Sequence, residues 1–93
     1  MTSTDTTTPD KAVLREEILA ELRRLAREEA GLTQEPRLTD RLVEDLGLDS
    51  VQLAVIATGL ERRYGIDLIA GACHVQTVAD VVALVDARLE ALP

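Results

Sequence analysis

The sequence predicts a small all-α domain, and three observations support this. Aliphatic residues recur at helical spacing along three segments, and no segment shows the alternation of a half-buried strand. Of 93 residues, 46% are hydrophobic but 1% are aromatic, so the core must be aliphatic, which favours helices. Glycine and proline separate the segments. We expect a four-helix bundle of three long helices and a short third helix, with a long first loop.

The first helix is expected from Pro9 to Ala30. Thr8 is a suitable cap before a proline at the first helical position, and Gly31 is well placed to end the helix. Its apolar stripe comprises Leu14, Ile18, Leu22 and Leu25. Residues 1–8 form a polar tract that cannot bury a face, so we expect a tail at 1–8 and one domain at 9–93.

A long connection follows, from Leu32 to Asp49. Loops of this length inside a small domain are usually functional. A short turn is expected between Thr39 and Leu42. The apolar residues of the connection are expected to fold back on the core: Leu38, Leu42, Val43, Leu46 and Leu48.

The second long helix is expected to begin after Asp49 as its cap. Asp49 and Gln52 have the spacing of a capping box, and Gly65 is expected to stop the helix. Its predicted buried face comprises Leu53, Ile56, Ala57, Leu60 and Tyr64.

Residues 66–74 leave room for one brief helical turn near 70–73. The last helix is expected to begin with Thr77 as its cap and Asp80 three residues on. Its predicted apolar face comprises Val78, Val81, Val82, Val85 and Leu89.

Composition excludes several classes of function. The formal net charge is −7, which argues against nucleic acid and anionic membrane surfaces and suits docking onto basic protein surfaces. The single cysteine, Cys73, excludes an internal disulfide and a multi-cysteine metal site. The chain shows no signal peptide, no span of bilayer length and no heptads, so a cytoplasmic monomer is expected.

Ser50 is the principal candidate functional residue. A serine in the first turn of a helix lies beside free backbone N–H groups and the positive end of the helix dipole, where a phosphate ester is stabilised. Serine is also common there for capping reasons alone. A serine nucleophile needs a base and an oxyanion hole, but His74 is the only histidine and Ser50 lies in no Gly-x-Ser-x-Gly elbow.

The run Leu46-Gly47-Leu48-Asp49-Ser50-Val51, followed by Leu60-Glu61 and Tyr64-Gly65-Ile66, resembles the signature region of acyl carrier proteins. Thr77-Val78-Ala79-Asp80 resembles the start of the family's last helix, and the resemblance covers about residues 10–91. Val51 stands where leucine is commonest. The resemblance implies an acyl-carrier-like bundle that is not an enzyme.

Carried over to this sequence, the resemblance implies that Ser50 bears 4′-phosphopantetheine, installed from coenzyme A by a separate phosphopantetheinyl transferase. Asp49 matches the acidic residue that in the family helps the transferase and its metal. A helix cap is an equally good interpretation of Asp49, and one carboxylate can do both.

The expected docking surface departs from the acidic second helix that is usual in fatty-acid carriers. Here that helix offers a mostly neutral surface beside the serine, and we expect it to dock partners within a rim of loop carboxylates. The predicted partner-binding residues are Val51, Ala54, Val55, Thr58, Asp45 and Glu44.

These observations predict a discrete acyl carrier of a polyketide or hybrid natural-product pathway. Its expected partners are the transferase, an acyl-loading acyltransferase or ligase, and a ketosynthase or other acyl-processing enzyme. The run Gly47–Ser50 lacks the Gly-Gly-His/Asp-Ser pattern of peptidyl carriers. A stand-alone peptidyl or aminoacyl carrier and a helical interaction module without the arm are the alternatives.

Overall fold

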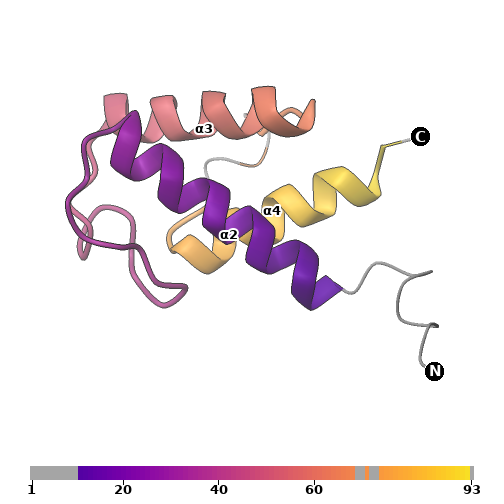
Figure 1. Cartoon of the computed structure of the whole chain (residues 1–93), viewed down its shortest axis with the longest axis horizontal. Helices are drawn as coiled ribbons and strands as arrows, with labels where there is room; N and C mark the ends of the chain where they lie inside the picture. The colour runs from indigo at the N-terminus through magenta and orange to yellow at the C-terminus, as the bar shows by residue number, and fades with distance from the viewer. Residues whose placement is uncertain (1–10, 69–70, 72–73, 93) are drawn as a thin grey trace.

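The computed structural model describes residues 11–68, 71 and 74–92, and these form three helices without a strand. The helices are α2 (Lys11–Glu28), α3 (Ser50–Tyr64) and α4 (Val78–Glu90) (Figure 1). The all-α prediction is confirmed for this part of the chain. The predicted tail at 1–8, the Thr8 cap and the start of the first helix at Pro9 lie outside the described residues. So does most of the predicted short helix near 70–73, so the fourth helix stays a prediction.

Local capping fixes where α3 and α4 begin, as the sequence predicts. Asp49 and Gln52 form a capping box at α3, and Thr77 and Asp80 form one at α4. Gly65 ends α3 in the left-handed conformation, with φ of 67°, which costs glycine little. The first helix ends earlier than expected, at Glu28 rather than Ala30.

The core lies between the three helices and the connection at 29–49. Each helix contributes part of its predicted stripe to the core, whereas six stripe residues are only half-buried: Leu14, Leu53, Ala57, Tyr64, Val81 and Leu89. Ala26 is fully buried although it belongs to none of the predicted apolar stripes. The buried apolar residues are Ile18, Leu22, Leu25, Ala26, Leu42, Leu46, Leu48, Ile56, Leu60, Leu68, Val78, Val82 and Val85.

The connection at 29–49 is bound to the start of α4. The Leu42 N–H donates to the Gln76 carbonyl at 2.9 Å, and the Val78 N–H donates to the Asp40 carbonyl at 3.0 Å. These paired bonds make an antiparallel bridge between Arg41 and Thr77. The loop that precedes Ser50 is thereby held against the body of the domain.

Two residues of this connection correct the prediction that all five of its apolar side chains fold inward. Leu38 is 46% exposed and Val43 is 56% exposed. The chain makes a helical turn at 42–46, which directs Leu42 and Leu46, four residues apart, to the core and turns Val43 away. Leu48 is buried as predicted.

Candidate functional site

Ser50 is the first residue of α3 and its side chain is exposed. At this position the backbone N–H groups of Ser50 and Val51 have no carbonyl partner within the helix. No described residue accepts a hydrogen bond from either of them. The Ser50 hydroxyl is therefore exposed to solvent and lies beside two unpaired backbone N–H groups at the positive end of the helix dipole.

Asp49 holds the backbone on which Ser50 is presented. Its Oδ1 accepts a hydrogen bond from the Gln52 N–H at 2.7 Å, and its own N–H donates to Gln52 Oε1 at 3.0 Å. The Leu53 N–H donates to the Asp49 carbonyl at 2.9 Å, which closes the first turn. Asp49 is exposed, so this carboxylate remains accessible to solvent while it caps the helix.

An open groove between α2 and α3 reaches Ser50 and encloses about 760 Å³. Its α3 wall contains the four predicted partner-binding residues of this helix: Val51, Ala54, Val55 and Thr58. Its other wall comes from α2, including Leu25, and from Glu29 just beyond the helix. This second wall is not among the predicted docking residues, because nothing local in the sequence shows which helix packs beside α3.

Gly59 allows α2 to approach α3 closely at the floor of the groove. A Cβ atom placed on Gly59 would lie 2.5 Å from Leu25 Cδ2, well inside van der Waals contact. Leu25 is itself buried. The depth of the groove therefore depends on the absence of a side chain at position 59.

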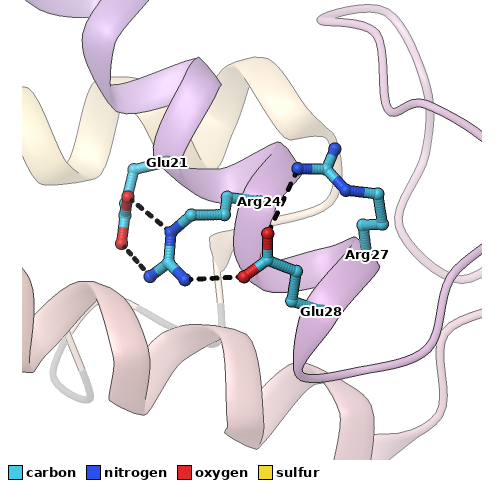
Figure 2. A network of polar contacts seen from close by, with 4 residues as sticks. All are labelled: Glu21, Arg24, Arg27 and Glu28. Carbon is cyan, nitrogen blue, oxygen red and sulfur yellow. Dashed lines mark hydrogen bonds and ion pairs between the residues drawn. The ribbon is translucent and has the colours of Figure 1, made fainter.

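An ion-pair network lies on the α2 side of the groove. Arg24 Nη2 lies 2.7 Å from Glu21 Oε2, and its Nη1 lies 3.1 Å from Glu28 Oε1 (Figure 2). Arg27 also contacts Glu28. The hydrogen bond from Arg24 holds the pKa of the Glu21 carboxyl below its ordinary value. Both of these carboxylates are compensated, whereas Glu29, which also lines the groove, has no ion pair among the described residues.

The predicted loop carboxylates Glu44 and Asp45 are exposed but do not line the groove. Asp45 accepts hydrogen bonds from the Arg41 N–H at 2.7 Å and from its guanidinium at 3.2 Å. These bonds lower the pKa of the Asp45 carboxyl. The charged residues at the far end of the groove are instead Arg62 and Arg63.

A second cavity, of about 160 Å³, lies in the apolar core. Residues from all three helices and from the connection line it, among them Leu46, Ile56, Leu68 and Leu84. This cavity is separate from the groove that contains Ser50, because the two share no lining residue.

Neither a cluster of metal-ligating side chains nor a membrane-spanning helix is found in the described part of the chain. Residues 11–68, 71 and 74–92 contain no group of three or more His, Cys, Asp or Glu side chains arranged to hold a metal ion. His74 is exposed, and Cys73 lies outside the described residues. None of the described helices is both long enough and apolar enough to cross a membrane.

Comparison with known proteins decides the family. The profile of the phosphopantetheine attachment site matches residues 20–85. The chain belongs to the acyl carrier protein family. It is 36% identical over 81 residues to an acyl carrier protein of Rhodococcus erythropolis, covering 82% of this chain and 85% of the relative. No solved structure matches the chain significantly.

Family membership defines the cofactor and the general role. The cofactor is 4′-phosphopantetheine, bound covalently. Acyl carrier proteins are carriers rather than catalysts and work together with acyl-processing enzymes.

Proposed function

We propose that Ser50 is the attachment residue and that this chain carries acyl groups on a phosphopantetheine arm. The observation that carries the proposal is the exposed Ser50 hydroxyl at the first residue of α3, within the matched residues 20–85. A phosphodiester on this oxygen would lie beside the unpaired N–H groups of Ser50 and Val51, which favour an anion. The surroundings of Ser50 therefore fit the cofactor.

The bound cofactor supplies a terminal thiol that holds the cargo as a thioester. This chain's own residues supply the anchor and its placement: Ser50 provides the oxygen and Asp49 fixes the turn that presents it. Tethering raises the effective concentration of the cargo at each partner. The apolar core cavity of about 160 Å³ is a suitable shelter for an alkyl part of the cargo.

We assign the carrier to a polyketide or hybrid natural-product pathway. The run Gly47–Ser50 and the surface of α3 support this, because the groove beside Ser50 presents Val51, Ala54 and Val55 where a fatty-acid carrier usually presents carboxylates. The proposed partners are a phosphopantetheinyl transferase, an acyl-loading enzyme and a ketosynthase.

Intact mass tests the attachment directly. The chain is incubated with coenzyme A, magnesium and a broad-specificity phosphopantetheinyl transferase. We expect the wild type to gain one phosphopantetheine and Ser50→Ala to gain none. Ser3→Ala is the matched control, because Ser3 is the other serine of the chain. This variant should still gain one phosphopantetheine. An unmodified but folded wild type would leave an interaction module without the arm as the function.

The docking surface is tested at Val55, which lines the groove. A carboxylate placed in the apolar centre of an interface must be desolvated without a partner. We expect Val55→Glu to lower kcat/KM for acyl transfer from the holo-chain to a polyketide ketosynthase by roughly tenfold or more. Val43→Glu is the control, since Val43 is 56% exposed and does not line the groove. Unchanged transfer by Val55→Glu would remove this surface from the proposal.

A further inference from the structure

The side-chain amide of Gln52 joins the start of α3 to the end of α2. Its Oε1 accepts a hydrogen bond from the Asp49 N–H at 3.0 Å, and its Nε2 donates to the Ala30 carbonyl at 3.0 Å. Ala30 lies 22 residues away, beyond the last residue of α2. Figure 1 shows the end of α2 and the start of α3 at the same end of the molecule.

The two hydrogen-bond partners of the Gln52 side-chain amide allow it only one orientation. The Asp49 N–H is a donor and requires the amide oxygen, whereas the Ala30 carbonyl is an acceptor and requires the amide nitrogen. The carbonyls that end a helix have no partner within it, so Gln52 satisfies one of the groups left open past α2. A capping box needs only a hydrogen-bond acceptor at the third helical position, which Gln52 occupies. The bond from Gln52 to Ala30 is therefore not part of the cap.

The bond from Gln52 to the Ala30 carbonyl lies close to Ser50 in the sequence and beside the groove that Ser50 lines. Ser50 stands between Asp49 and Gln52, and it lines the groove together with Glu29, the residue before Ala30. The bond therefore links the two walls of the groove at the end where Ser50 lies. Asp49 caps α3 but is bonded only within its first turn.

We propose that Gln52 is a positioning residue that holds Ser50 in register with α2 for phosphopantetheine transfer. The inference rests on the proposed attachment at Ser50. Gln52 acts through the backbone and has no contact with the reacting atoms in this role. Gln52 does not itself line the groove that contains the proposed docking residues, so loss of the link should affect the transfer step more than the binding of the transferase.

Two substitutions separate the link from the cap. Gln52→Glu keeps an acceptor for the Asp49 N–H but has no hydrogen to donate to Ala30. Gln52→Met is neutral and of similar length and makes neither bond. Gln34→Glu is the control: Gln34 Nε2 donates to the Asp45 carbonyl at 3.2 Å, so this variant loses the same kind of bond and gains the same charge elsewhere.

The measurement is the steady-state rate of modification of each apo-variant by the transferase with coenzyme A, with thermal unfolding to establish that each is folded. We expect Gln52→Glu and Gln52→Met to lower kcat about three- to tenfold with KM changed less than about twofold, and Gln34→Glu to match the wild type. If Gln52→Met does not fold, Gln52→Asn, which is too short to reach Ala30, takes its place.

Three outcomes would overturn the proposal. Wild-type kcat in Gln52→Glu would show that the link does not position Ser50. A loss in Gln52→Glu but not in the neutral variant would show that added charge is the cause. An equal loss in Gln34→Glu would show that the effect is not specific to this site. A wild type that is never modified would instead contradict the proposed attachment.

Discussion

At the scale of single residues, Asp49 combines two roles that a matched substitution can separate. Its Oδ1 caps α3 through the Gln52 N–H, and the resemblance to acyl carrier proteins predicts that the same exposed carboxylate contacts the transferase and its metal. Asparagine caps a helix about as well as aspartate does but carries no charge. The cap and the contact therefore respond differently to Asp49→Asn and Asp49→Ala.

We expect Asp49→Ala to lower the free energy of unfolding by about 1 kcal/mol and Asp49→Asn to lower it by less than about half of that. Both should lower kcat/KM for modification about tenfold or more, because each removes the charge on which a metal contact depends. Urea unfolding and the transferase assay measure the two effects. An Asp49→Asn variant that is modified at the wild-type rate would leave Asp49 as a cap only.

At the scale of a helix, the capping box of α4 ties its stability to pH. Asp80 accepts hydrogen bonds from the Gln76 and Thr77 N–H groups, both at 3.0 Å, and these bonds hold the pKa of its carboxyl below the ordinary 3.8. A carboxyl whose pKa is lower in the folded state than in the unfolded state stabilises the fold at pH values above its unfolded-state pKa. That stabilisation is lost as the pH falls through the folded-state pKa.

We therefore expect Asp80→Asn to unfold at a lower temperature than the wild type at pH 7, with the difference shrinking below about pH 4. Thr77→Ala is the comparison, because the hydroxyl does not titrate: it should cost about 1 kcal/mol at pH 7 and change less with pH than Asp80→Asn does. Thermal unfolding followed by circular dichroism between pH 2.5 and 7 checks this. A gap between Asp80→Asn and the wild type that stays constant with pH would contradict the assignment.

The features that the sequence predicted correctly are local in the chain. Both capping boxes span four consecutive residues, and the left-handed end of α3 depends on Gly65, so the bounds of α3 follow from neighbouring residues. The same locality made Ser50 the candidate at the start of a helix, where the structure places it, while its modification stays a prediction.

The features that the sequence did not predict depend on contacts between distant segments. The exposure of Val43 follows from the register of the turn that the connection makes against α4. The α2 wall of the groove and the bond from Gln52 to Ala30 depend on which helices pack together. No spacing within a single segment carries that information.

At the scale of the whole molecule, two ion pairs between described residues join α2 to α4: Lys11 with Glu90, and Arg15 with Asp86. Arg15 Nε on α2 donates to Asp86 Oδ2 on α4 at 2.9 Å, across 71 residues of sequence. The Asp86 side chain is 2% exposed, whereas that of Arg15 is 52% exposed. Among the described residues, Asp86 Oδ1 has no hydrogen-bond partner. The pair is therefore asymmetric: the carboxylate is buried, and the guanidinium can reach water.

This asymmetry predicts unequal costs for removing the two partners. Arg15→Met leaves a buried carboxylate without its cation and should lower the free energy of unfolding by about 3 kcal/mol. That is a large part of the 5–15 kcal/mol that is typical of a small domain. Asp86→Leu leaves only a guanidinium that can turn to solvent, so it should cost much less.

The double variant Arg15→Met/Asp86→Leu should recover most of the stability lost in Arg15→Met, because an apolar pair of similar size replaces a buried ion pair at little cost. Urea unfolding of the wild type, the two single variants and the double variant measures the four free energies of unfolding that this comparison needs. Equal losses in the two single variants would show that the pair acts as an exposed surface contact. The expected order would instead show that the stabilising role of Arg15 is to compensate the buried Asp86 carboxylate.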